Sequence, residues 1–303
     1  MTKRIGFRHL HHFLAMAQEK SMTRAAQALN TVQPALSRSL RELEQELEAP
    51  LFHRTPQGLI LTEAGEELLA HTKGPLNQID AGIASVRGER ERASVRISVA
   101  PAASRMLCVD AISAFSEQFP AVQIAVEARH YSECVPQIRD GTIDFAVGRI
   151  LDPKLLVGLG YVHLFEEPIV FCARAGHPLA GVGRVTMAQI NGYQIVAPMR
   201  YAVIWDDVTR FLVRHGLTEF DRLLETSSYE FSRQYIRETD AITCTSRSIV
   251  RPEIDSGEFV QLDIPVDDMM GSVGVTYRAE GRMSPHAQAL FDHVRAAAQQ
   301  RYP

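Results

Sequence analysis

The hydrophobic pattern of this 303-residue chain changes its period near residue 93, and this change constrains the fold more than any other feature. Before it, apolar residues recur every three or four positions, which is the spacing of amphipathic helices. From Val95 onward, short runs of alternating apolar residues lie between helical stretches, as in proteins that layer helices on sheets. We therefore predict an α+β multi-domain protein with a helical front end and a larger α/β body.

The front end predicts three short helices. Residues of the first recur at i, i+3, i+4 and i+7, namely Leu10, Phe13, Leu14 and Ala17. A second fits Met22–Leu29, with Ser21 as its N-cap. Gln33-Pro34 opens a third helix, since proline is tolerated in a first turn. Its apolar stripe consists of Leu36, Leu40, Leu43 and Leu47.

The other face of the third helix is mainly polar near its start. It presents Gln33, Pro34, Ser37, Arg38 and Arg41. Apolar anchors on one side with hydrogen-bonding groups at the N-terminal end of the other are what a DNA recognition helix requires. The alternative for Arg38 and Arg41 is that they are solvated charges paired with the nearby glutamates.

The segment Leu51–Thr62 predicts a small hairpin around Pro56-Gln57-Gly58, of the kind called a wing. Arg54 would lie at its base, where it could contact a phosphate of double-stranded DNA rather than a base edge. The charge distribution favours the same partner. Residues 1–62 contain eight Lys/Arg and five Asp/Glu, whereas the rest of the chain contains 24 and 31. Only the front end is therefore suited to a polyanion.

Residues 8–65 resemble the winged helix-turn-helix of the LysR-type transcriptional regulators, through SMTRAAQALN, QPALSRSLRELEQELEAPLFHRT and LTEAG. The resemblance implies a DNA-binding domain over 1–62. It also implies that Gln33, Pro34, Ser37 and Arg38 enter the major groove, with Arg38 the candidate for a guanine edge. The sequence departs from the family at Val32, where Ser or Thr is common, and so lacks one helix cap and one phosphate contact.

A long helix is expected over the linker region, residues 63–92. Its apolar seam alternates spacings of four and three, through Thr72, Leu76, Ile79, Ile83 and Val86. Such a seam favours pairing with a second helix, although it could instead pack on its own body. Gly74-Pro75 should kink or split the helix. The resemblance implies a homodimer that binds inverted repeats, a homotetramer at the next level, and RNA polymerase as a candidate partner.

Residues 93–303 predict a two-lobed α/β domain. Strands are expected at 95–99, 122–128, 143–148, 162–165, 168–174, 194–197, 223–226, 241–245, 259–262 and 272–278. Helices are expected at about 104–119 and over 133–139, 203–214, 230–238 and 285–300. This alternation implies largely parallel sheets.

The strings DGTIDFAVGRI, CARAGHPLA and ITCTSRSIV resemble the LysR-type effector-binding domain, which is similar to periplasmic solute-binding proteins. Lobe one would comprise 93–165 plus 269–303, and lobe two 166–268, with a ligand bound in the crevice between them.

The predicted effector is a small anionic molecule, an aromatic or sugar carboxylate. Arg149 directly follows a predicted strand and could clamp a carboxylate, or else pair with an internal acid. Ser104 lies near a helix start, where anions are favoured. The resemblance assigns further crevice positions, which are Ala102, His130, Tyr131, Arg200, Tyr201 and Ser228. For Tyr131 and Tyr201 plain packing is the alternative, and at Ala102 the hydroxyl common in the family is missing.

Other classes of protein find little support in the sequence. No GxSxG, HExxH, Walker or GxGxxG motif appears in a suitable context, so we expect neither an enzyme nor a cofactor. Four dispersed cysteines argue against zinc and disulfides, and His9, His11 and His12 lack partners for a metal site. No apolar run could span a membrane and no signal peptide is evident, which predicts a cytoplasmic protein. A transport-type binding protein is the remaining alternative, but it would not need a basic winged module.

Overall fold

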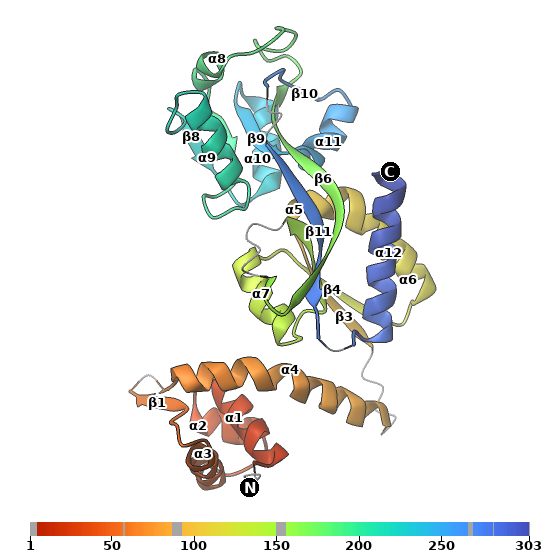
Figure 1. Ribbon diagram of the computed structural model, residues 1–303. Coiled ribbons are helices and arrows are strands. Elements are labelled where there is room, and N and C mark those ends of the chain that lie inside the picture. Colours follow the sequence, from red (N-terminus) through yellow and green to blue (C-terminus); the bar gives the residue numbers. More distant parts are fainter. Residues whose placement is uncertain are drawn as a thin grey trace. The chain divides into compact units, whose positions relative to one another are not determined.

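The computed structural model describes residues 5–302 apart from 57, 87–92, 150–155, 266–268 and 281. The chain forms two compact units, built mainly from residues 1–91 and 92–303 (Figure 1). Among the described helices, none has the length and apolar character needed to cross a bilayer.

The N-terminal unit contains the predicted three helices and hairpin. Its elements are α1 (Phe7–Glu19), α2 (Met22–Ala28), α3 (Gln33–Leu47), β1 (Phe52–Thr55), β2 (Gly58–Leu61) and α4 (Glu63–Val86). The apolar stripes of α1 and α3 meet in one core, where Phe13 and Leu36 are fully buried and the Phe13 and Phe52 rings lie 5.5 Å apart. The helices α1 and α3 were predictable because their apolar residues recur in the sequence at helical spacing.

One close approach ties the hairpin to the first helix. The backbone N–H of Leu59 donates to the carbonyl of Lys20, at 3.0 Å. Gly58, beside it, has φ +125°, and a Cβ there would lie 2.3 Å from the same carbonyl oxygen. Only glycine fits this position, because both the conformation and the space exclude a side chain.

The linker helix α4 begins after Thr62, whose hydroxyl accepts a hydrogen bond from the backbone N–H of Gly65, at 3.1 Å. The expected split at Gly74-Pro75 does not occur, since α4 continues through Pro75 to Val86. Along the predicted seam Leu76 is buried, whereas Ile79 and Ile83 are exposed by 37% and 45%. The last residues of the predicted linker, 87–92, lie outside the described residues.

The second unit begins with the elements of lobe one. They are β3 (Ser94–Val99), α5 (Pro101–Ala103), the π-helical turn η1 (Ser104–Cys108), α6 (Val109–Gln118), β4 (Gln123–Glu127), α7 (Tyr131–Arg139) and β5 (Phe145–Arg149). The elements that follow are β6 (Leu159–Arg174), α8 (Met187–Asn191), β7 (Ile195–Ala197), α9 (Trp205–Arg214), β8 (Leu223–Glu225), α10 (Tyr229–Glu238), β9 (Ile242–Ser246), α11 (Arg247–Asp255), β10 (Phe259–Gln261), β11 (Met270–Arg278) and α12 (Pro285–Arg301).

The strands of this unit form one connected sheet in the order β4-β3-β5-β11-β6-β9-β7-β8, with β10 paired to β6. Pairs within each half, such as β3 with β4 and β7 with β8, are parallel. The long strands β6 and β11 pair antiparallel with each other and with their neighbours. The expectation of largely parallel sheets is therefore wrong for the middle of the sheet.

Strand β6 also corrects the prediction of two strands at 162–165 and 168–174. It is continuous over sixteen residues, and Pro168 pairs with Met270 at the end of the β11 ladder. The N–H of Ile169, the next residue, donates to the Met269 carbonyl at 2.8 Å, so the chain continues in strand conformation past the proline. Figure 1 shows β6 and β11 side by side, running from one half of this unit to the other.

Two separate apolar cores lie along these strands. One surrounds Phe115 and Phe145, with residues from 95–165 and 273–298. The other surrounds Phe171 and Phe211, with residues from 169–269. We call these halves lobe one and lobe two. Two short helices, α8 and α11, were not predicted from the sequence.

Candidate functional sites

The start of α3 carries the first candidate site. Gln33, Pro34 and Arg38 are exposed and Ser37 is half-buried, while the opposite face of the helix buries Leu36, Leu40, Leu43 and the hydroxyl-bearing Ser39. The helix begins after Val32 without a side-chain cap. No side chain at the N-cap position therefore accepts a hydrogen bond from the first backbone N–H groups, which lie at the positive end of the helix dipole.

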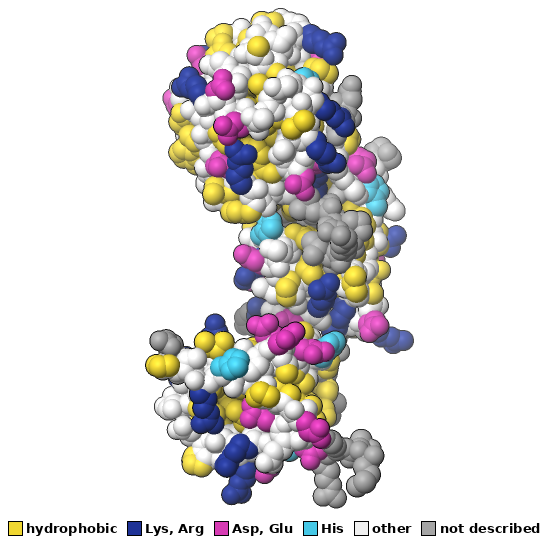
Figure 2. All heavy atoms as spheres, turned by 60° about the vertical axis from the view of Figure 1, so that its left-hand side comes forward, with side chains coloured by type: hydrophobic (Ala, Val, Ile, Leu, Met, Phe, Trp, Pro, Cys, Tyr) yellow, Lys and Arg dark blue, Asp and Glu magenta, His cyan; other side chains and the backbone are white. Residues whose placement is uncertain are grey.

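The cations near this face are not neutralised by the neighbouring acids. Arg41 donates from Nε to the Ser37 carbonyl, at 3.3 Å, and none of Arg38, Arg41 and Arg54 forms an ion pair with a described residue. Arg54 is exposed on β1 of the wing. Figure 2 shows Lys and Arg side chains at the lower left of this unit, and carboxylates along its upper edge, in its middle and at its lower right. The alternative considered from the sequence, in which Arg38 and Arg41 pair with nearby glutamates, is therefore not observed among the described residues.

The N-terminal histidines serve separate contacts. His9 lies 3.1 Å from a Glu42 oxygen, and His11 lies 3.5 Å from Asp80. Burial lowers the pKa of His12, and the nearby Arg8 lowers it further. Within the described residues no three His, Cys, Asp or Glu side chains gather as metal ligands would.

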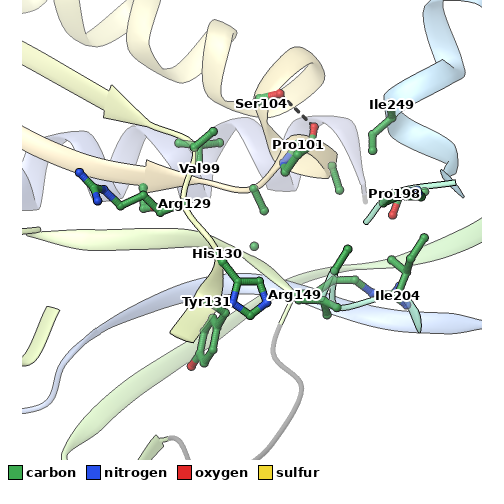
Figure 3. Close-up of a pocket in the computed structure, with 18 of the residues that line it drawn as sticks. Val99, Pro101, Ser104, Arg129, His130, Tyr131, Arg149, Pro198, Ile204 and Ile249 are labelled. Carbon is green, nitrogen blue, oxygen red and sulfur yellow. Dashed lines mark hydrogen bonds between the residues drawn. The ribbon is translucent and has the colours of Figure 1, made fainter. Parts of the chain in front are cut away.

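The second candidate site is a cavity of about 400 Å³ in the second unit, with walls from both lobes. In Figure 3, Val99, Pro101, His130 and Tyr131 of lobe one face Pro198, Ile204 and Ile249 of lobe two. Most of these lining side chains are apolar, so the few polar groups among them determine what can bind. The volume suits a molecule of metabolite size.

Six of the eight crevice residues expected from the sequence line this cavity: Ala102, Ser104, His130, Tyr131, Arg149 and Tyr201. Ser104 lies in η1, and its hydroxyl donates to the Pro101 carbonyl at 2.9 Å. Tyr201, at 59% exposure, lies with its ring centre 5.4 Å from that of His130 and nearly perpendicular to it. This edge-on contact joins the two lobes.

The other two, Arg200 and Ser228, do not line the cavity. The Arg200 guanidinium lies 4.3 Å from the Trp205 ring centre and 3.4 Å from a Glu225 oxygen. The Ser228 hydroxyl caps α10 by accepting from the backbone N–H of Phe231, at 3.1 Å. Each of the two side chains thus makes a structural contact outside the cavity wall, and an effector contact for either residue stays a prediction.

Arg149 is the last residue of β5 and is only 5% exposed. Its Nη2 lies 3.3 Å from the Glu167 carbonyl and 3.3 Å from the Asp207 carboxylate. Its Nη1 is buried without a hydrogen-bond partner among the described residues. Burial lowers the pKa of Arg149, and the carboxylates of Asp207 and Glu167 oppose that effect. A buried cation with an unpaired donor is costly unless an acceptor joins it.

A close glycine makes room for this guanidinium. Gly271, in β11, faces it so closely that a Cβ would lie 1.7 Å from Arg149 Nη2. The strand pairing of β5 with β11 brings the two residues together. The position of the Arg149 side chain therefore depends on a strand more than a hundred residues away in the sequence.

His130 supplies a second donor. Its Nδ1 accepts a hydrogen bond from the backbone N–H of Ser132, at 3.3 Å, and lies 2.7 Å from the Ser132 hydroxyl. In the neutral ring the proton is then on Nε2. That atom is buried and has no partner in the described part of the chain, so His130 offers an N–H group where it lines the cavity.

Sequence reasoning missed the lobe-two polar residues of the wall. They include Thr226, Tyr229, Thr245 and Ser246. Burial raises the pKa of Tyr229 to about 12, so its hydroxyl stays neutral. The only signal in the sequence was the alternation of hydroxyl residues in Thr243-Cys244-Thr245, within an otherwise apolar strand.

Comparison with known proteins identifies both units. Residues 7–66 match the family model of bacterial regulatory helix-turn-helix proteins of the lysR family, and residues 88–299 match the LysR substrate binding domain. Among curated relatives, the transcriptional regulator PcaQ of Agrobacterium fabrum is 32% identical over 300 residues, covering 98% of this chain and 96% of that protein. The uncharacterized regulator YdcI of Escherichia coli is 29% identical, covering 97% and 96%.

Solved structures show the same fold. ArgP of Mycobacterium tuberculosis superposes with a TM-score of 0.75 at 20% identity, covering 97% of this chain and 98% of that one. LysG of Corynebacterium glutamicum, solved with a bound effector, superposes with a TM-score of 0.72 at 20% identity, covering 98% and 99%. The relatives are transcriptional regulators rather than enzymes. With both of its units matched, this chain belongs to the LysR family of DNA-binding transcriptional regulators that carry an effector-binding domain.

Proposed function

We propose that this regulator responds to a small carboxylate, aromatic or derived from a sugar, bound between the two lobes. The observation that carries the proposal is a pair of buried donors in the cavity wall, Arg149 Nη1 and His130 Nε2, that have no hydrogen-bond partner among the described residues. Two donors, one of them charged, call for an anionic acceptor. The apolar remainder of the wall favours a ligand whose body is a ring or a short carbon skeleton.

On the DNA side, Gln33, Pro34, Ser37 and Arg38 would contact bases in the major groove, and Arg41 and Arg54 would contact phosphates. Arg38 and Arg54 are exposed and form no ion pair with any described residue, which supports these roles. The phosphate contacts would then supply most of the affinity and salt dependence, whereas Arg38 would supply sequence preference.

We further propose three functional regions: 1–62 for DNA binding, 63–92 for dimerisation, and 93–303 for the effector, divided into lobe one (93–165 and 269–303) and lobe two (166–268). The exposed Ile79 and Ile83 of α4 support pairing with a second copy of the chain. A homodimer would present two copies of α3 to an inverted repeat, and two dimers would form the tetramer. RNA polymerase remains a candidate partner of the DNA-bound assembly.

Calorimetry with benzoate tests the effector proposal. We expect wild type to bind benzoate and Arg149→Met to bind it at least about tenfold more weakly, because removing the guanidinium removes its charge-assisted hydrogen bonds to the carboxylate. Arg210→Met is the matched control, since Arg210 also contacts Asp207 but is 68% exposed and does not line the cavity. Equal affinity in wild type and Arg149→Met would remove the arginine from the proposal.

Selection from a random duplex library tests the DNA proposal. Arg38→Ala should relax the enriched sequence at one position, whereas Arg54→Ala should weaken binding to all duplexes and reduce the salt dependence. Each variant serves as the control for the other. An unchanged sequence preference in Arg38→Ala would contradict the base-reading role of Arg38.

A further inference from the structure

On the lobe-two side, the cavity wall contains a buried polar atom for which the described residues supply no partner. Thr245, in β9, is 3% exposed, and its hydroxyl forms no hydrogen bond within the described residues. Thr245 lines the cavity. A buried hydroxyl without a partner is unusual in folded proteins and calls for a ligand or a water molecule.

The strand neighbours of Thr245 give no structural reason for a hydroxyl. Thr245 pairs with Val170 of β6, and alternation along the strand puts Thr243 and Cys172 on the same face. The neighbours on this face include Val170, Ile249 and Val250, which form an apolar cluster. Valine, which has the same shape, would pack there without an unsatisfied oxygen.

The unpartnered polar atoms are therefore divided between the lobes. Arg149 and His130 offer N–H donors from lobe one, and Thr245 offers a hydroxyl from lobe two. Apolar side chains make up much of the remaining wall, among them Val99, Pro198 and Ile249. A molecule that satisfies all three atoms has a carboxylate for the two N–H donors, an apolar body, and a further group that hydrogen-bonds a hydroxyl.

We propose that Thr245 is a specificity-determining residue and that the effector is a hydroxylated carboxylate whose hydroxyl group pairs with Thr245 Oγ1. This inference rests on the proposed carboxylate site. A ligand that contacts both lobes at once also draws them toward one arrangement, since its two ends bind different halves of the unit.

A bound water molecule is the competing explanation. A recess of about 10 Å³, enough for roughly one water, opens beside Thr245 and is also lined by Thr243. Thr243 does not line the main cavity. The two threonines therefore separate the explanations, because a water in the recess would involve both residues, whereas a ligand in the cavity would involve Thr245 alone.

The test measures the affinity of the full chain by calorimetry for benzoate, 3-hydroxybenzoate and 4-hydroxybenzoate, and for hexanoate and 6-hydroxyhexanoate. Wild type should bind at least one hydroxylated acid about tenfold or more tighter than its parent, because a site built for a hydroxyl rejects the analogue that lacks it. Thr245→Val should lose this preference and keep the affinity for the parent acid. Thr243→Val should keep the preference.

The outcomes are distinct. Binding of the parent acids without any hydroxyl preference, or the same preference in Thr245→Val as in wild type, overturns the role of Thr245 and leaves the carboxylate site standing. Equal effects of Thr243→Val and Thr245→Val would mean that the Thr245 hydroxyl binds a water molecule in the recess, which also overturns the proposed role of Thr245. Failure of wild type to bind any of the acids overturns both proposals. If Thr245→Val does not fold, Thr245→Ser should retain the preference and Thr245→Ala should lose it.

Discussion

The Arg149 guanidinium of lobe one lies 3.3 Å from the Asp207 carboxylate of lobe two, and both side chains are largely buried. Asp207 stands in the first turn of α9 and also contacts Arg210. The cation expected to bind an effector is therefore already engaged by an internal acid, through one nitrogen and at a distance longer than that of strong charge-assisted bonds. A ligand carboxylate would meet an arginine that is held in place but only partly satisfied.

This relationship predicts the behaviour of Asp207→Asn. The substitution removes the internal negative charge, so the Arg149 guanidinium should bind carboxylates more tightly, by about three- to tenfold. The cost is a free energy of unfolding lower by about 1–3 kcal/mol, because a buried cation loses its charged partner. Calorimetry with benzoate and urea unfolding measure the two effects. Weaker carboxylate binding in Asp207→Asn would mean that Asp207 positions Arg149 rather than competing for it.

Gly271→Ala should displace the Arg149 side chain without removing it. The added Cβ would lie 1.7 Å from Nη2, so we expect at least a tenfold loss of carboxylate affinity and about 1–3 kcal/mol of destabilisation from overpacking. Gly183→Ala is the control, since a Cβ there meets nothing within 4 Å. Wild-type affinity in Gly271→Ala would show that the guanidinium can move aside at no cost to binding.

Gly58→Ala should act on the other unit. Its positive φ and the 2.3 Å approach to the Lys20 carbonyl predict a destabilisation of the N-terminal unit by about 2–4 kcal/mol. DNA affinity in a gel shift should fall, while effector affinity stays as in wild type. Gly6→Ala, where the nearest atom is 3.8 Å from the added Cβ, should change neither. Retained DNA binding in Gly58→Ala would argue against a rigid wing.

The stability of the second unit should depend on pH through Glu167. Burial raises the pKa of this carboxyl group above its ordinary 4.5, against the opposing hydrogen bond from the Ser248 N–H at 2.7 Å. The folded state thus keeps the proton to higher pH than the unfolded chain does. The free energy of unfolding should consequently fall as the pH rises from about 4.5 through the raised pKa.

Glu167→Gln cannot ionise, so that fall should be shallower in the variant. Urea unfolding at closely spaced pH values between about 4 and 8 compares the two proteins. Glu166→Gln, at the 53% exposed neighbouring position, controls for the loss of one carboxylate. Parallel curves for wild type and Glu167→Gln would show that Glu167 takes up no extra proton on folding.

The parts of the fold that were predictable are those set by local pattern. The apolar stripes that contain Phe13 and Leu43 encode two helices, and the turn at Gly58 encodes a hairpin, each from residues that are near one another in the sequence. The continuity of β6 was not predictable, because Pro168 normally interrupts a strand and only the distant partner β11 maintains the ladder there. Likewise α11 contains Pro252, which conceals a helix in the sequence.

The site divides in the same way. Arg149 could be anticipated because it follows a predicted strand, but its contact with Asp207 depends on how two lobes meet. Arg200 and Ser228 were expected in the crevice from the family resemblance, yet one stacks on Trp205 and the other caps a helix. Thr245 was missed because a threonine in a strand is ordinary β-sheet composition, and only the burial of its hydroxyl without a partner distinguishes it.

Strand β6 passes from one lobe into the other and is bonded to β11 over nine residue pairs. The halves of this domain are consequently not interchangeable parts: a chimaera that took one of them from a relative would have to match two strand registers at once. New ligand preferences in such a scaffold can arise far more readily by replacing single side chains around the cavity than by exchanging a lobe.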